Sequence, residues 1–176
     1  MIEHIETARM AMRALALDDV DILVKLDGDP AVMRYINGGK STSRIAMEEI
    51  VRQQRGHRWL AFHQSSGEFI GWFGIPFSDK GTHDRELGYR LRRSHWGKGL
   101  ATEGARALIA VAFRDLGAHR VWAQTMTVNT ASRRVMEHCG LRYVRLFHLE
   151  WPEAIDGTEF GDVEYEILKT DWEAAG

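Results

Sequence analysis

The segment that most constrains the fold is Gly88–Thr102, which reads GYRLRRSHWGKGLAT. Alternating apolar residues at its start predict a strand, the Gly97-Lys98-Gly99 run predicts a tight loop, and the apolar spacing through 100–116 predicts an amphipathic helix. Strand, glycine loop and helix start form a common phosphate site, because glycines admit the ligand and helix-start N–H groups point at the anion. The segment therefore predicts a bound phosphorylated ligand, with a plain turn as the alternative.

Known phosphate-binding fingerprints do not account for this loop. The dinucleotide-binding pattern needs a third glycine at fixed spacing, and the P-loop needs Gly-Lys-Ser/Thr; neither occurs here. A GxG pair is otherwise common in turns that hold no ligand.

Composition narrows the class of protein. The chain has 176 residues, which fits one domain spanning 1–176, and its net charge of −2 gives no support to a nucleic-acid or membrane-surface role. The one cysteine, Cys139, excludes an internal disulfide and a cysteine-based metal cluster, and the histidines lack metal-ligand spacing, so no metal is predicted. The N-terminus does not resemble a signal peptide and no apolar run could span a bilayer, so we expect a cytoplasmic protein.

The remaining sequence predicts alternating strands and helices. In chain order we expect a strand at 9–13, helices at 17–27, 30–35 and from Ser41–Ser43 to 55, strands at 57–64, 68–77 and 85–92, a helix at 99–116, a strand at 120–126, a helix at 129–138, a strand at 141–150, a loop at 151–161 and a strand at 163–168.

The run LGYRLRRSHWGKGLATEGARAL resembles the central motif of the GNAT superfamily of N-acetyltransferases, in its RimJ/RimL-like branch. The family loop has the form Gln/Arg-x-x-Gly-x-Gly/Ala; Gly97 and Gly99 match it, and Ser94 stands at the Gln/Arg position. The resemblance covers nearly the whole chain. It implies an α/β (α+β) GNAT fold: a central, mostly antiparallel mixed sheet of six to seven strands with a splayed parallel pair, flanked by helices.

The same resemblance implies acetyl-CoA as co-substrate. Tyr89 and Leu91 would pair with its pantetheine arm through main-chain groups. Its phosphates would be neutralised by three basic side chains, Arg92, Arg93 and Lys98. For each of them, a place on a solvated basic edge without a ligand is the alternative. The pyrophosphate would be wrapped by Trp96, Gly97, Lys98, Gly99, Leu100, Ala101 and Thr102.

A second motif, Asn129-Thr130-Ala131-Ser132, is similar to the GNAT pattern Asn-x-x-Ala/Ser. The family asparagine touches the pantetheine or the substrate, but Asn129 could also be a helix N-cap. Many family members place a tyrosine seven residues later to protonate the departing thiolate, where this chain has Met136. Ser132 is then the nearest candidate to stabilise the thiolate, with helix capping as its alternative role.

A catalytic base is also expected, because a protonated amine cannot attack a thioester. At pH 7, deprotonation costs about 1 kcal/mol for an α-amine and about 4.6 kcal/mol for a lysine-type amine. Glu86 is the first candidate, unless Arg85 or Arg90 pairs with it. Late carboxylates are alternatives: Glu150, Glu159 and Asp162.

These features predict transfer of an acetyl group from acetyl-CoA to a primary amine by direct attack in a ternary complex. The amine acceptor would be a protein N-terminus or a small molecule. Its pocket is expected between residues 30–55 and an acidic loop at 150–161. The alternative is a non-catalytic acyl-CoA-binding module of the same fold. No nucleic-acid or membrane partner is expected, and the chain would be a monomer or homodimer.

Overall fold

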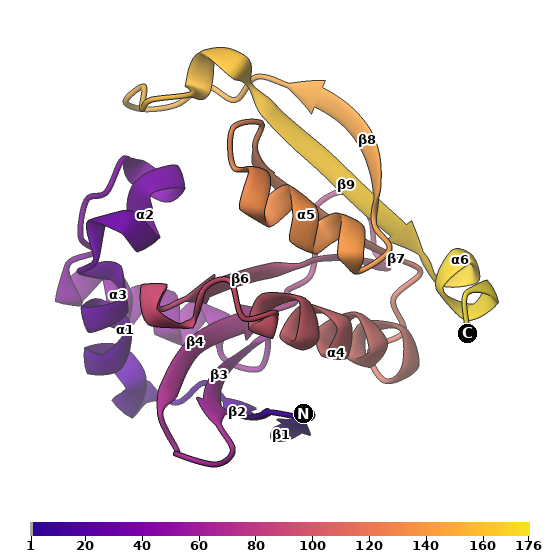
Figure 1. Cartoon of the computed structure of the whole chain (residues 1–176), viewed down its shortest axis with the longest axis horizontal. Coiled ribbons are helices and arrows are strands. Elements are labelled where there is room, and N and C mark those ends of the chain that lie inside the picture. Colours follow the sequence, from indigo (N-terminus) through magenta and orange to yellow (C-terminus); the bar gives the residue numbers. More distant parts are fainter. Residues whose placement is uncertain (1) are drawn as a thin grey trace.

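Two β-sheets joined by one continuous segment form the centre of the structure (Figure 1). The computed structural model describes residues 2–176. Its elements are β1 (His4–Glu6), β2 (Met10–Ala14), η1 (Leu17–Asp19), α1 (Val20–Asp27), α2 (Pro30–Asn37), α3 (Arg44–Gln54), β3 (Arg58–His63), β4 (Phe69–Gly74), β5 (Asp84–Glu86), β6 (Gly88–Leu91), η2 (Arg93–His95), α4 (Leu100–Arg114), β7 (Arg120–Met126), α5 (Thr130–His138), β8 (Arg142–Phe147), η3 (Thr158–Phe160), β9 (Asp162–Leu168) and α6 (Lys169–Ala174).

The sheets have five and four strands, in the orders β1-β2-β3-β4-β6 and β5-β7-β9-β8. Among the strand pairs of residues 2–176, only the β5–β7 pair is parallel. The mixed, mostly antiparallel architecture confirms the predicted fold class, but the strands form two sheets rather than one sheet of six to seven.

The expected strand at 85–92 is wrong as a single element, because its pairing partner changes at Leu87. Residues of β5 pair with β7, whereas residues of β6 pair with β4. The Leu87 N–H donates to the Trp122 carbonyl at 2.8 Å, immediately before the chain turns to β4. Beyond this point β6 and β7 diverge, and we call the gap between them the splay.

Among the strands and α-helices, two short elements were not predicted. β1 has three residues, of which only Ile5 is buried, and α6 buries none of its residues. Neither segment has a pattern of apolar residues long enough to predict a strand or a helix from the sequence.

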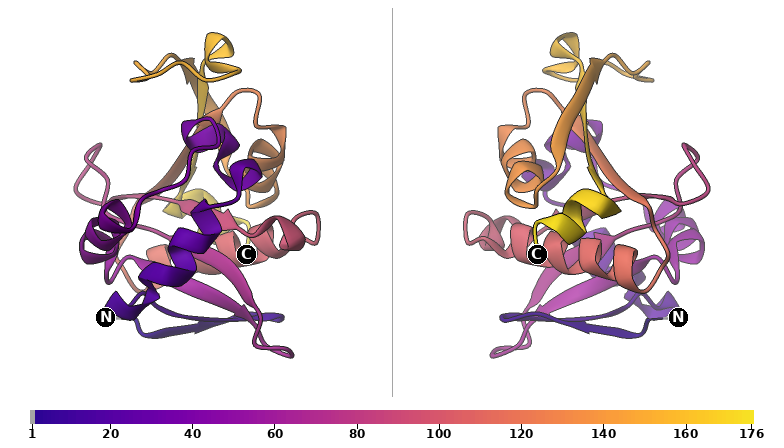
Figure 2. Two further views of the ribbon diagram at one scale, coloured as in Figure 1. Left: turned by 90° about the vertical axis from the view of Figure 1, so that its left-hand side faces the viewer. Right: turned by 90° about the vertical axis from the view of Figure 1, so that its right-hand side faces the viewer.

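Helices cover both faces of the five-stranded sheet (Figure 2). α4 packs on one face within a core that includes Phe73, Leu108 and Val121. α1 and α3 pack on the other face with Leu60 and Trp72. The splay thus has α4 and α5 on one side and the N-terminal helices on the other. In residues 2–176 no helix combines the length and apolar composition that a membrane span requires.

α4 lies against β4 with no room for a side chain at Gly104. A Cβ there would overlap the Phe73 ring, which is fully buried. Gly104→Ala should gain up to about 1 kcal/mol of helix propensity and lose about 1–3 kcal/mol to overpacking, so we expect net destabilisation. Urea denaturation measures this difference. Ala110→Gly on the same helix isolates the propensity effect, and a more stable Gly104→Ala protein would contradict the close packing.

Candidate functional site

The glycine loop presents unpartnered backbone N–H groups at the start of α4. Gly99 is the helix N-cap with φ 77°, and no side chain caps the helix. Gly97 has φ 70°, and a Cβ there would meet nothing within 4 Å. The first helical N–H groups have no intrahelical partner, so they point outward together with the positive end of the helix dipole. This geometry suits an anion such as a pyrophosphate.

An ionic contact to the N-terminal segment supports this loop. Arg9 donates from Nη1 to the Lys98 carbonyl at 2.8 Å and from Nε to Glu103 at 2.7 Å. Glu103 also accepts a 2.6 Å bond from the Thr7 hydroxyl. Burial acts to raise the pKa of Glu103, but these hydrogen bonds hold it below its ordinary value. Glu103 therefore holds the loop as a carboxylate.

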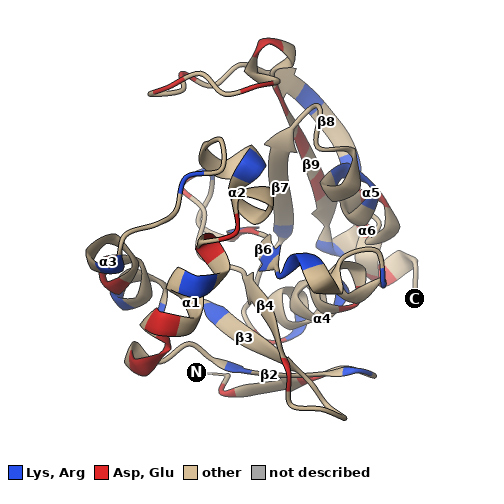
Figure 3. Ribbon diagram, turned by 60° about the vertical axis from the view of Figure 1, so that its left-hand side comes forward, with Lys and Arg blue, Asp and Glu red and all other residues tan. Residues whose placement is uncertain are grey.

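Basic residues gather on the segment leading from β6 to α4 (Figure 3). Arg92 pairs with Glu68 at 3.0 Å, and Arg93 lies 3.6 Å from Asp29. Within residues 2–176, Lys98 forms no such pair. Of the cations expected to neutralise phosphates, two are thus already partnered by acids that sequence reasoning did not connect to them.

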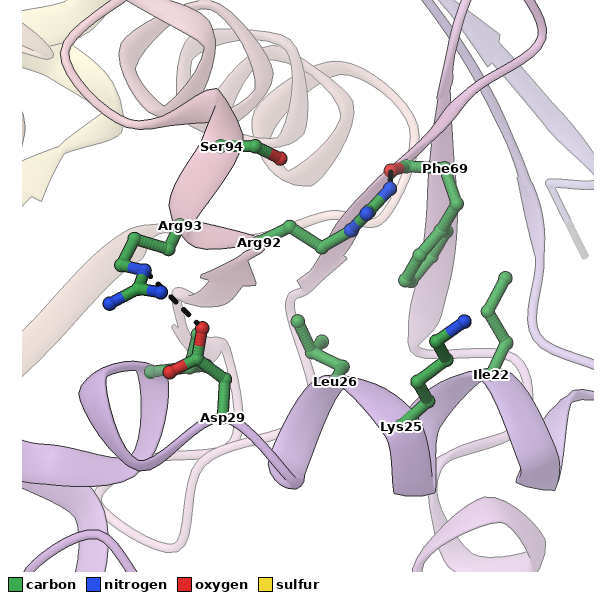
Figure 4. Close-up of a pocket in the computed structure, with 9 residues that line it drawn as sticks. Ile22, Lys25, Leu26, Asp29, Phe69, Arg92, Arg93 and Ser94 are labelled. Carbon is green, nitrogen blue, oxygen red and sulfur yellow. Dashed lines mark hydrogen bonds and ion pairs between the residues drawn. The ribbon is translucent and has the colours of Figure 1, made fainter.

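Two hollows flank the loop. One of about 550 Å³ lies between α1 and the segment after β6, with Lys25 and Leu26 facing Arg92 and Arg93 (Figure 4). Another of about 700 Å³ lies at the start of α4, where Gly99 and Thr102 form part of its wall. The second hollow adjoins the free N–H groups.

Along the splay, β6 has no pairing strand on its β7 side in the part of the chain that the structure describes. Arg92 donates from its N–H to Ile70 on β4, so in this antiparallel pair the groups of Tyr89 and Leu91 face the opposite side, toward the splay. The Leu91 carbonyl accepts a 2.9 Å bond from the Trp96 indole. The Trp96 indole thus occupies one main-chain acceptor at the loop end of the splay.

Ser132, at the start of α5, contacts Tyr89, and Asn129 contacts Ser132. Asn129 caps α5 by accepting from the Ser132 N–H at 3.3 Å, so the capping alternative describes its observed contact. The Ser132 and Tyr89 hydroxyl oxygens lie 3.1 Å apart. Burial raises the pKa of Tyr89 to about 12. Sequence reasoning gave Tyr89 a main-chain role only; its strand alternation with Leu87 and Leu91 could have indicated that the ring faces α5.

Glu86 lies on the face of the four-stranded sheet opposite to the face that α5 covers. In the β5–β7 pair it is directly opposite Trp122. Gln124, two residues further along β7 on the same face, is exposed. Burial raises the pKa of Glu86; Lys80 opposes this and Asp79 adds to it. Within residues 2–176 the carboxylate has no hydrogen-bond partner.

The expected alternative for Glu86, an ion pair with Arg85 or Arg90, is wrong. Arg85 turns into the interior and stacks 3.6 Å from the Phe77 ring centre. Arg90 bonds to the buried Asp27 at 2.6 Å. Both arginines have partners elsewhere, which leaves a half-buried carboxylate with a raised pKa, the state that a general base requires.

The loop between β8 and β9 lies against the end of α2. A Cβ at Gly38 would lie 2.8 Å from Ile155 Cγ2, and Lys40 pairs with Glu153. The two segments expected to form the acceptor pocket are therefore neighbours.

The loop's carboxylates do not form one free acidic cluster. Glu153 is neutralised by Lys40, and Glu159 accepts from the Gly157 N–H at 3.0 Å. Asp162 is buried, and burial raises its pKa.

Cys139 is free and buried, and burial raises its pKa to about 11, so it is a poor nucleophile. Residues 2–176 hold no group of three or more His, Cys, Asp and Glu side chains arranged to take a metal ion.

Comparisons with known proteins identify relatives of this chain. The family model for the acetyltransferase (GNAT) domain matches residues 9–142. A curated relative, the FsC-acetyl coenzyme A-N(2)-transacetylase of Aspergillus fumigatus, is 33% identical over 96% of this chain and 77% of its own length.

Solved structures share the fold. A GNAT-family acetyltransferase from Bacillus anthracis has TM-score 0.81 and 25% identity, covering 95% of this chain and 99% of its own. RimL, a ribosomal L7/L12 alpha-N-protein acetyltransferase solved with coenzyme A, has TM-score 0.78 and 19% identity, covering 94% and 98%.

Proposed function

Because the chain belongs to the GNAT acetyltransferase family and is an acetyl-CoA-dependent acetyltransferase, we propose that it acetylates a primary amine by direct attack in a ternary complex. The single observation that carries the proposal is the N-terminus of α4, which lacks a side-chain cap within residues 2–176, with left-handed glycines before it, beside the splay. Acetyl-CoA supplies the activated acyl group.

The loop and the splay fit this co-substrate. The N–H groups of 97–102 would hold the pyrophosphate, assisted by Lys98, and Leu100, Ala101 and Thr102 provide the helix-start donors. Tyr89 and Leu91 would pair with the pantetheine by main-chain groups, although Trp96 already occupies the Leu91 carbonyl. Arg92 and Arg93 would need to exchange their acidic partners for a phosphate.

Two side chains act on opposite sides of the splay. Glu86 accepts the proton of the attacking amine, and its raised pKa brings its basicity closer to that of the amine. Ser132, from the first turn of α5, donates a hydrogen bond to the sulfur as negative charge develops there. Asn129 fixes the turn that carries Ser132.

The acceptor would approach from the side of the N-terminal helices and the loop between β8 and β9. Both acceptor classes stay within the proposal. RimL is named for a protein α-amine, which supports a RimJ/RimL-like role, and the Aspergillus relative is named for the N(2) position of FsC.

Release of the free CoA thiol, measured with a panel of peptides carrying α-amines, polyamines and amino acids, tests the proposal. We expect turnover with at least one class and a matching mass gain of one acetyl group on the acceptor. Tight acetyl-CoA binding with no release for any amine would instead support the non-catalytic binding module.

A further inference from the structure

Tyr89 and Ser132 approach each other from elements far apart in the sequence, β6 and α5, with 3.1 Å between their hydroxyl oxygens. We propose that Tyr89 is a positioning residue, whose O–H donates to Ser132 Oγ so that the serine proton points at the sulfur leaving group. The inference rests on the proposed acetyl transfer and adds to it a side-chain role that the family motif does not give.

Both ends of this contact are fixed. The Tyr89 ring packs on the buried Phe73 with 6.0 Å between ring centres. The Ser132 main chain is held by Asn129, the α5 cap. Neither hydroxyl depends on a mobile side chain for its position.

Proton counting gives the pair its function. Two hydroxyls carry two protons, and the bond between them uses one. The other proton has no acceptor among the hydrogen bonds of residues 2–176. When Tyr89 donates, the free proton is on Ser132, which lies on α5 beside the splay where the thioester would lie. When Ser132 donates to Tyr89 instead, its proton is no longer available for a hydrogen bond to the sulfur. The direction of the Tyr89–Ser132 bond therefore decides whether Ser132 can stabilise the thiolate.

The phenol of Tyr89 is a stronger acid than the aliphatic hydroxyl of Ser132, which makes Tyr89 the better hydrogen-bond donor of the two. Its pKa of about 12 keeps the phenol protonated at neutral pH, and Cys139, the other titratable group close to it, is also held neutral by burial. An ordinary thiol has a pKa of about 8.5, so proton transfer from this phenol to a thiolate would be strongly uphill. Tyr89 therefore acts by hydrogen bonding and not as an acid.

The step balances without a further reactant. The amine nitrogen forms a bond to the carbonyl carbon and loses a proton to Glu86. The carbon–sulfur bond breaks, and the sulfur keeps the electron pair as a thiolate. The Ser132 O–H hydrogen-bonds that thiolate, which water later protonates. Met136, at the position of the usual family tyrosine, takes no part.

A double-mutant cycle on kcat tests the coupling. Tyr89→Phe and Ser132→Ala should each lower kcat by about tenfold or more while the KM for acetyl-CoA changes by less than about twofold, because the bond strengthens only as charge develops. Tyr89→Phe should have no further effect in the Ser132→Ala background. Tyr143→Phe, on an exposed tyrosine of β8, is the matched control with unchanged kcat. Additive losses in the cycle would overturn the positioning role.

A second readout needs no turnover. A hydrogen bond to the thiolate lowers the pKa of the thiol of bound CoA, which thiolate ultraviolet absorbance reports. We expect this pKa to be higher by about one unit in both Tyr89→Phe and Ser132→Ala, a tenfold change in the ionisation constant. Equal values in wild type and Tyr89→Phe would overturn the inference alone. A wild-type protein that neither binds CoA nor acetylates any amine would overturn the proposed function as well.

Discussion

Gly97→Val is expected to weaken acetyl-CoA binding by at least about 100-fold, which corresponds to about 3 kcal/mol or two charge-assisted hydrogen bonds lost. Gly97 has φ 70°, and the space above it is empty of protein atoms within 4 Å of a Cβ. A branched side chain would fill the space that a phosphate needs to reach the N–H groups, and would strain the left-handed backbone. Isothermal titration calorimetry measures the loss.

Gly117→Val is the matched control, because it separates strain from lost binding. Gly117 also has a positive φ, 66°, and also meets nothing within 4 Å, but it follows the far end of α4. Both variants should lose a similar stability of about 1–2 kcal/mol from the left-handed backbone. Only the Gly97 variant should lose binding. Wild-type affinity in Gly97→Val would remove the loop from the binding site.

Glu86→Gln is expected to lower kcat by about 10²–10⁴-fold without changing acetyl-CoA affinity, as is usual for loss of a general base. The loss should be greater for lysine-type amines, whose deprotonation at pH 7 costs about 4.6 kcal/mol, than for α-amines at about 1 kcal/mol. Steady-state kinetics with one acceptor of each type measures the difference. Glu166→Gln, on the same sheet face but paired with Arg120, should retain wild-type kcat.

The pH dependence follows from the environment of Glu86. Only the carboxylate can accept a proton, so kcat should rise as pH increases through the pKa of Glu86, which burial raises above its ordinary value. Asp79 adds to that shift through like charge, so Asp79→Asn should move the rise in kcat to lower pH. A rise at the same pH in wild type, Asp79→Asn and Glu86→Gln would assign the base elsewhere.

Local patterns in the sequence predicted the parts of the fold that depend on local chemistry. The glycine loop, the α4 start at Leu100 and the Asn129 cap all follow from residue type and helix spacing. The alternation through 85–92 was also correct, but pairing is not local. Nothing within that run shows that Leu87 is where the partner changes from β7 to β4.

The charges of the site were harder to predict for the same reason. Arg92 and Arg93 pair with Glu68 and Asp29, which belong to distant turns brought together only by the fold. Arg90, one of the expected partners of Glu86, extends to Asp27 on α1 instead. The Tyr89–Ser132 contact joins residues 43 positions apart. Each of these pairings depends on tertiary packing, which a single sequence does not contain.

Under the proposed function, the helices on opposite faces of the five-stranded sheet separate an acetyl-donor side from an acceptor side. The donor side would be built from the contiguous stretch 88–141, and the acceptor side from residues 17–55 and the loop between β8 and β9. Arg90 and Arg93 of the donor stretch pair with Asp27 and Asp29 of the acceptor half, so these two carboxylates must be kept when that half is exchanged. Transplanting α1–α3 with both carboxylates, together with the loop between β8 and β9, between relatives is then a direct route to a new amine specificity on an unaltered catalytic frame.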